Sequence, residues 1–367
     1  MHVRNPATEA DVMATRSERL IRMRLLRKAL LACAGAMACT GSSPSPPGEL
    51  WYAGPALCGF SHEQLKESGQ SRPSIILSTP GLSAFSDVAL DDHGNAWVVG
   101  TGSDDVLRFS AAELGEPGGA TPDLIVRSAA LRTPGNLIFD GGGALWVANR
   151  DPPPGRADGD GTLVRFDIPS GVTGLLTIEP SAQLSSDTPG DLFQIGNMAI
   201  DLDQNLWVTS FAGIVRFDHP NDIRGEVELT AGAVIDKSGY ADNSYFYSVA
   251  FDATGTLFAA SGDGLHYLTR VTAFANPSAL SGRSSPPPLL TITGEEDLLP
   301  AGGLAFDQIG DLWMATGVSI LRYSNPTALT GTVDLAPSLT LAVTGRDAPT
   351  TNSHLLFSHE LLGPDGG

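Results

Sequence analysis

The stretch Leu304-Ala305-Phe306-Asp307-Gln308-Ile309-Gly310-Asp311-Leu312-Trp313-Met314-Ala315 decides the fold of this 367-residue chain. An apolar run ends in Asp307, Gly310 follows three residues later, and a second apolar run contains Trp313. This spacing of Asp and Gly is typical of a tight turn, because the carboxylate caps the turn and glycine accepts a left-handed backbone. The stretch therefore predicts two antiparallel β-strands joined by a turn.

The same pattern recurs along the chain and contains all five tryptophans. Successive copies are 46 to 61 residues apart, which is the period expected of four-stranded propeller blades. Two further strands follow in most units, a third with Arg before an aromatic residue and a fourth that often begins near proline. The six copies centre on Trp51, Trp97, Trp146, Trp207, Phe258 and Trp313.

We therefore predict an all-β fold, a six-bladed β-propeller of four-stranded blades. The first unit lacks an inner strand, whereas residues 353–358 have the inner-strand pattern with no tryptophan strand after them. We expect this C-terminal strand to complete the N-terminal blade, which closes the ring and removes its edges. A seventh blade would have to lie between Trp146 and Trp207, and that interval contains one tryptophan motif.

The N-terminal region has the pattern of an export signal. Basic residues at 22–28 precede an apolar stretch at 29–38 that is far shorter than a membrane span, and a cysteine follows. This order resembles a bacterial lipoprotein signal in which Cys39 carries the lipid. Cys33 is the alternative lipid site by residue type, and an ordinary signal peptide cut after Ala38 is the other alternative.

The start of translation at Met23, or at Met13, fits this signal better than Met1. We therefore predict an upstream extension at 1–22, a signal peptide at 23–38, a flexible tether at 39–48 and the propeller at 49–367. The predicted location is the bacterial cell envelope, on the periplasmic side or the cell surface. Cys58 then stands without a disulfide partner, and we expect it to be buried in a blade.

The charge balance excludes one class of partner. Lys and Arg number 22 against 41 Asp and Glu, which gives a net charge of −19. Such a surface repels a phosphate backbone, so we expect no nucleic-acid partner. We expect a monomer that contacts the membrane only through its lipid anchor.

The apolar strand, Asp-x-x-Gly turn and Leu-Trp strand over residues 49–367 resemble the six-bladed propellers of the NHL-repeat and regucalcin/gluconolactonase types. This scaffold hosts hydrolases, lyases, isomerases and binding modules, so the resemblance implies the fold more than the function. Gluconolactonase-like members hold a divalent cation through acidic and amide residues where the inner strands begin. Glycine occupies that position here, at Gly135, Gly196 and Gly302.

The next position of each inner strand is mostly polar and is predicted to face the upper mouth of the channel. A carboxylate, amides and an imidazole there can bind a ligand or a divalent cation such as Ca²⁺. The same side chains can equally cap turns and hold water in a polar channel. The candidate ligand-binding residues are Asp87, Asn136, Asn197, Ser248 and His354.

Two other acidic patterns have structural interpretations. We expect the turn aspartates, including Asp201 in its calcium-loop-like run, to cap turns. Asp158-Gly159-Asp160-Gly161 has half of a calcium-loop pattern, and an exposed acidic hairpin is the commoner outcome for it. We expect the Arg of each third strand to be a solvated or stacked framework residue.

No catalytic motif appears in the sequence, and no residue is predicted to be catalytic. The leading hypothesis is a propeller that binds a small molecule or a protein partner on its upper face. The alternative is a divalent-cation-dependent lactonase-like hydrolase built on Asp87, Asn136, Asn197 and His354. A streptogramin-lyase-like propeller and a purely structural role are further alternatives, so the sequence leaves open whether the protein is an enzyme.

Overall fold

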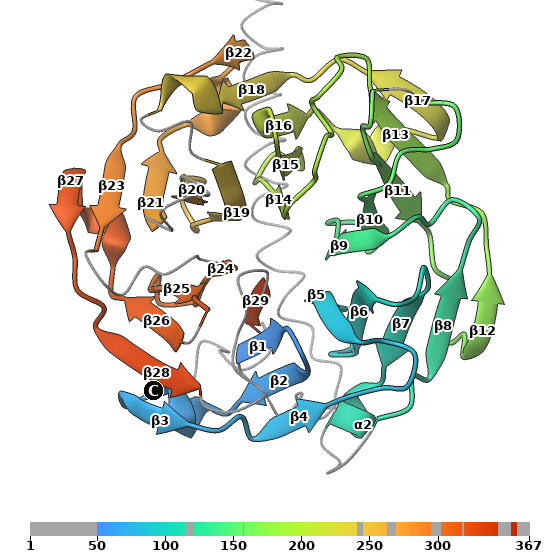
Figure 1. Cartoon of the computed structure of the whole chain (residues 1–367), viewed down its shortest axis with the longest axis horizontal. Helices are drawn as coiled ribbons and strands as arrows, with labels where there is room; N and C mark the ends of the chain where they lie inside the picture. The colour runs from blue at the N-terminus through green and yellow to red at the C-terminus, as the bar shows by residue number, and fades with distance from the viewer. Residues whose placement is uncertain are drawn as a thin grey trace, which may run out of the picture. The chain divides into compact units, whose positions relative to one another are not determined.

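The computed structural model describes residues 50–114, 120–156, 158–240, 245–262, 269–294, 302–317, 319–343 and 354–357. All of them belong to one compact unit, Pro44–Gly367. In this unit six β-sheets surround a common axis as blades (Figure 1). The prediction of an all-β, six-bladed propeller is confirmed.

Each blade is built from four antiparallel strands of its own, which follow one another in order from the axis to the rim. Blade 1 consists of β29 (His354–Phe357), β1 (Leu50–Ala53), β2 (Leu57–Phe60) and β4 (Ile75–Leu77). Blade 2 consists of β5 (Ala84–Leu90), β6 (Ala96–Thr101), β7 (Val106–Phe109) and β8 (Leu124–Arg127). Blade 3 consists of β9 (Pro134–Phe139), β10 (Leu145–Asn149), β11 (Thr162–Phe166) and β13 (Ala182–Ser186).

The remaining blades have the same order. Blade 4 consists of β14 (Met198–Ile200), β15 (Leu206–Ser210), β16 (Gly213–Phe217) and β18 (Ala233–Asp236). Blade 5 consists of β19 (Tyr245–Phe251), β20 (Leu257–Gly262), β21 (Thr269–Phe274) and β23 (Leu290–Thr293). Blade 6 consists of β24 (Leu304–Phe306), β25 (Leu312–Ala315), β26 (Ser319–Tyr323) and β28 (Leu339–Val343).

Five of the six sheets also carry a fifth, outermost strand that pairs in parallel with the fourth strand. It is supplied by the next blade, from the connection between that blade's third and fourth strands. The prediction of four strands is therefore right for each blade's own strands and incomplete for the sheets. The added strands are β12 (Gly174–Thr177), β17 (Gly225–Leu229), β22 (Gly282–Ser284), β27 (Gly331–Asp334) and β3 (Gly69–Ser71).

In blade 2 the corresponding connection contains the helix α2 (Ala111–Leu114), and the described sheet of blade 1 has four strands. Short 3₁₀ helices precede four of the five added strands. They are η1 (His62–Leu65), η2 (Pro220–Asp222), η5 (Pro277–Ala279) and η6 (Pro326–Ala328), and η3 (Lys237–Gly239) follows β18.

The ring is closed at two places between the beginning and the end of the chain. At the axis, β29 pairs with β1 over four residues, from Leu50 opposite Phe357 to Ala53 opposite His354. At the rim, β3 pairs in parallel with β28 of blade 6. The predicted closure by the C-terminal strand is confirmed, and the outer closure was not predicted because it depends on the added strands.

The hydrophobic core is divided among the junctions between neighbouring blades, each with its own cluster. The tryptophan of each blade, or Phe258 in blade 5, packs toward the next blade. Trp97 meets Phe139 edge to face with 5.7 Å between ring centroids. Cys58 is fully buried in β2, as predicted.

The antiparallel order defines two faces. The upper face carries the beginnings of the inner strands, the connections between second and third strands, and the connections from one blade to the next. The lower face carries the Asp-x-x-Gly turns and the connections between third and fourth strands. In the described part of the chain no helix is long and apolar enough to cross a membrane.

Candidate functional site

The predicted inner-strand residues join neighbouring blades at the upper end of the channel. Asp87 lies in β5, is 5% exposed, and accepts a hydrogen bond from the backbone N–H of Leu137 in β9, with 2.9 Å between N and Oδ2. Asn136, fully buried in β9, places its Nδ2 3.5 Å from the same oxygen. Asp87 therefore ties blade 2 to blade 3.

The next blades repeat this link. Asn197 accepts a hydrogen bond at Oδ1 from the backbone N–H of Val249, at 3.0 Å. Ser248 in turn accepts one at Oγ from the backbone N–H of Leu304, at 3.1 Å. Four of the five predicted residues thus lie at equivalent positions, while His354 belongs to β29 and its side chain lies outside the described residues.

The residues at this mouth do not fit a divalent cation. Gly135 stands where the resemblance places a ligand, and a Cβ built on it would lie 2.2 Å from Nε of Arg150. A protein cation therefore occupies the space where a ligand side chain would project, and the oxygens of Asp87 and Asn197 already accept backbone N–H bonds. Among the described residues, no group of three His, Cys, Asp or Glu side chains can hold a metal ion.

Arg150 is the residue of this mouth that the sequence analysis did not single out. It follows β10 directly, its side chain is half-buried, and it crosses the innermost strand at Gly135. Burial lowers the pKa of its guanidinium, and the negative charge of Asp87 opposes that shift. No described residue accepts a hydrogen bond from the guanidinium or forms an ion pair with it within 4.0 Å.

The backbone beside Arg150 is strained and held in place by polar contacts. Thr133 has a φ of 47°, which is uncommon for a β-branched residue. Its N–H donates to Asp104, its hydroxyl donates to Asp151 at 2.6 Å, and its carbonyl accepts from the N–H of Arg150. Such strain persists only where the surroundings enforce it, which is typical of ligand sites.

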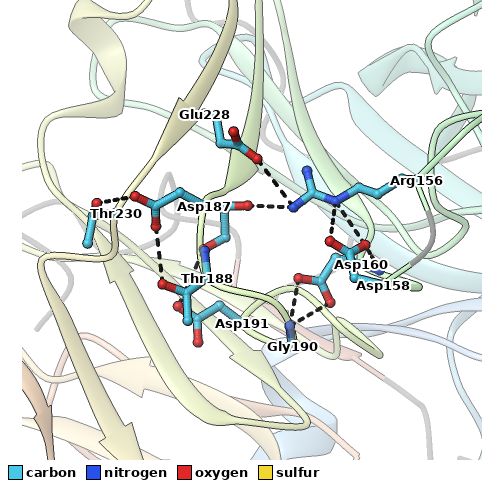
Figure 2. Close-up of polar contacts among 10 residues, drawn as sticks. Arg156, Asp158, Asp160, Asp187, Thr188, Gly190, Asp191, Glu228 and Thr230 are labelled. Carbon is cyan, nitrogen blue, oxygen red and sulfur yellow. Dashed lines mark hydrogen bonds and ion pairs between the residues drawn. The ribbon is translucent and has the colours of Figure 1, made fainter.

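The long loop after Arg150 is fixed by the network in Figure 2. Arg156 contacts both carboxylate oxygens of Asp158 and the carbonyl of Ser186, and its Nη2 lies 3.6 Å from Glu228. Asp160 is fully buried and accepts the N–H of Gly190 at both carboxylate oxygens.

Burial raises the pKa of Asp160. The prediction of an exposed hairpin at 158–161 is wrong at Asp160, because this residue is fully buried. Its carboxylate caps the turn at Gly190, in the connection that follows β13. The local geometry is not that of a calcium loop, because the carboxylate oxygens of Asp158 and Asp160 accept hydrogen bonds from N–H groups.

An aromatic cluster formed by Phe193, Phe211 and Tyr245 lies on the same face. Phe211 is 40% exposed, and its ring centroid is 5.7 Å from that of Phe193 and 5.5 Å from that of Tyr245. The ammonium of Lys237 lies 3.5 Å from the ring centroid of Phe211 and 3.8 Å from that of Tyr245. Burial lowers the pKa of Lys237.

The two cations of this face that the structure singles out, Arg150 and Lys237, were not predicted as site residues. One signal for Arg150 is present in the sequence. It follows a tryptophan strand directly, at the start of the longest second-to-third connection, and the inner strand of the same blade has Gly135 at the channel. The position of Lys237 over the rings depends on two blades and has no local signal.

No protein-family model and no curated protein matches this sequence. Among solved structures, a protein of unknown function from Bacteroides caccae is 12% identical, covers 84% of this chain and 99% of its own, and has a TM-score of 0.50. A streptogramin B lyase is 12% identical, with 83% of each chain covered and a TM-score of 0.46.

The extracellular domain of a putative one-component system from B. thetaiotaomicron is 15% identical, with a TM-score of 0.44. The match covers 71% of this chain and 31% of that one, so the present chain spans about a third of its length. At these identities the likeness concerns the propeller fold alone.

Proposed function

We propose that this propeller binds the anionic group of a small molecule at the upper mouth of its channel, with Arg150 as the main contact. One observation carries the proposal: a half-buried guanidinium is held at the innermost strands, and no described residue accepts a hydrogen bond from it. A guanidinium presents several donors that match a carboxylate or a phosphate.

The surroundings support this assignment. Asp87 is the carboxylate that acts on Arg150 electrostatically, and its Oδ1 and Oδ2 accept the N–H groups of Val88 and Leu137. The donors of Arg150 therefore stay available to a ligand. The contacts of Thr133 hold the backbone of Arg150 in place before a ligand arrives, which lowers the entropy cost of binding.

The test is thermal melting of the full chain, first freed of metal, with inorganic phosphate and separately with malonate. A ligand at about 100 times its dissociation constant adds about 2.7 kcal/mol, which shifts the midpoint by several degrees. We expect a shift with one of these anions that Arg150→Gln abolishes. Arg127→Gln is the matched control, because Arg127 is an exposed arginine that pairs with Asp105.

Two outcomes contradict the proposal. The first is an anion shift that survives in Arg150→Gln, and the second is no shift with either anion. Because phosphate and malonate are tested separately, the result also distinguishes the two anionic groups.

The cation-dependent lactonase is the second candidate, with Asp87, Asn136, Asn197 and His354 as its residues. The positive charge of Arg150 at the position of a ligand side chain disfavours it. Melting with Ca²⁺, Mg²⁺, Mn²⁺ or Zn²⁺ tests it directly. A midpoint raised by a cation in the wild type and not in an Asn136 and Asn197 double variant would replace the anion proposal.

We also infer export with a lipid on Cys39 as the membrane anchor, from the basic and apolar order of residues 22–39. A monomer with no other membrane contact remains part of this proposal. A lipidated protein partitions into the detergent phase of a Triton X-114 extract. Cys39→Ser is expected to abolish this partition and Cys33→Ser to retain it; the reverse result would move the lipid to Cys33.

A further inference from the structure

The lower face carries a cavity of about 600 Å³ at the lower ends of the inner strands. This volume lies within the range of small-molecule sites. Apolar side chains from neighbouring inner strands form its walls, namely Ile138, Met198, Ile200, Phe251, Phe306 and Phe357. The cavity is on the opposite face from Arg150 and does not share residues with the upper mouth.

Two apolar side chains of the cavity project into water. Leu202 is 69% exposed and Ile309 is 75% exposed, and both belong to the Asp-x-x-Gly turns or their equivalents on the lower face. The turn residues at the place of Ile309 in other blades are polar or glycine, as in His93 and Thr254. Large exposed apolar side chains around an apolar cavity are typical of a binding site.

A buried carboxylate also lines this cavity. Asp252 is 5% exposed, and its Oδ1 accepts the backbone N–H groups of Thr254 and Thr256, each at 2.8 Å. Its Oδ2 is buried and accepts no hydrogen bond from any described residue. An unpaired buried carboxylate oxygen is costly, so it marks a position where a donor is expected.

The missing donor has an identifiable cause. In blades 2, 3, 4 and 6 the equivalent oxygen accepts the indole N–H of the blade's tryptophan, at 2.8 to 3.3 Å. Blade 5 has Phe258 at that position, which has no N–H. Asp252 therefore retains a carboxylate oxygen that its own blade does not satisfy.

We propose that the lower cavity binds a small molecule with an apolar body and a protonated amine, whose ammonium pairs with Asp252. The apolar walls and rim of the cavity favour a ligand with an apolar body, and the carboxylate of Asp252 favours a positively charged group on it. The residues that line the cavity include Asp307 as a second carboxylate and no Lys or Arg, which disfavours an anion. A neutral apolar ligand would leave Oδ2 of Asp252 without a donor.

The test uses three probes of one shape: 4-phenylbutylamine, 4-phenylbutanol and 4-phenylbutyrate. Their dissociation constants for the full chain are measured at pH 7 by ligand-observed NMR. A charge-assisted hydrogen bond predicts that the amine binds about tenfold more tightly than the alcohol. We expect Asp252→Asn to reduce this preference to less than about twofold, because the amide is uncharged.

Phe258→Trp is a second variant that leaves Asp252 in place. It supplies the indole N–H found in the other blades, so the preference for the amine should fall as in Asp252→Asn. Ile309→Ser should weaken all three probes, and Leu175→Ser, a 58% exposed leucine on the outer strand β12, is its matched control. Equal binding of amine and alcohol by the wild type, or a preference unchanged in both blade-5 variants, would overturn the proposal.

Discussion

At the scale of single residues, the tryptophan of a blade connects three parts of the fold. The indole N–H of Trp207 donates to Asp201 at the turn, at 2.9 Å, and the guanidinium carbon of Arg216 lies 5.5 Å from the ring centroid. Phe251 of blade 5 meets the same ring edge to face, at 5.9 Å between centroids. Arg108, Arg216 and Arg322 are thus stacked framework residues, as predicted. The ring offsets part of the free-energy cost of burying each guanidinium.

Trp207→Phe should reduce the free energy of unfolding by about 2 to 3 kcal/mol, because it removes the hydrogen bond to Asp201 and buried apolar area and weakens the stack under Arg216. Urea denaturation of this variant, of Asp201→Ala and of the double variant measures the coupling. We expect a coupling energy of about 1 kcal/mol. Additive effects of the two substitutions would show that the indole bond to Asp201 does not contribute.

At the scale of elements, the added outer strands depend on a short connection with special backbone angles. His219, Asn276 and Asn325 adopt left-handed φ values of 46°, 49° and 45°, and a proline then opens each 3₁₀ helix. Five residues after that proline, a glycine with positive φ begins the added strand, as at Gly225 with φ 71°. The turn redirects the chain so that its next residues lie along the neighbouring blade.

Gly225→Ala should destabilise the protein by about 1 kcal/mol, because an L-residue at this φ is strained even where its Cβ has room. No atom lies within 4 Å of a Cβ built on Gly225, so the loss would be due to the backbone alone. Gly317→Ala is the matched control, since Gly317 has equal space without a positive φ. Equal midpoints in urea for the two variants would contradict this explanation of the added strands.

At the scale of the whole molecule, stability depends on closing a ring whose core lies between blades. Leu355 and Phe357 of β29 are buried in the cluster between blades 6 and 1, where Phe357 meets Trp313 at 5.6 Å between centroids. The outer closure by β3 involves three residues that are exposed or half-buried. The inner closure therefore buries more apolar surface, which is the main stabilising contribution.

A chain that ends at residue 353 should lose cooperative thermal unfolding or melt many degrees lower, because β1 becomes an open edge beside an exposed core. A chain that ends at residue 357 keeps β29 and serves as the control, with an unchanged midpoint expected. If the two truncated chains melt alike, the inner closure is not what holds the ring together.

The sequence by itself determined the six blades, the closing strand, the turn aspartates and the stacked arginines, because each belongs to a short pattern that recurs in most units. It also placed Asp87, Asn136, Asn197 and Ser248 near the beginnings of inner strands. It did not predict that the backbone N–H groups of the next blade are hydrogen-bond donors to Asp87, Asn197 and Ser248. The added strands went unpredicted because β17 lies along a blade that precedes it by about 40 residues and carries no tryptophan signal.

Only the tertiary structure decided what those residues contact. Leu137 satisfies Asp87 because blade 3 lies beside blade 2, and Arg150 reaches the channel because Gly135 leaves the space. Among the described residues Oδ2 of Asp252 has no donor, because Phe258 stands six positions later where the other blades have tryptophan. Only the geometry of those blades shows what this difference means. Hydrogen bonding and burial depend on distances between blades, and a local pattern does not contain those distances.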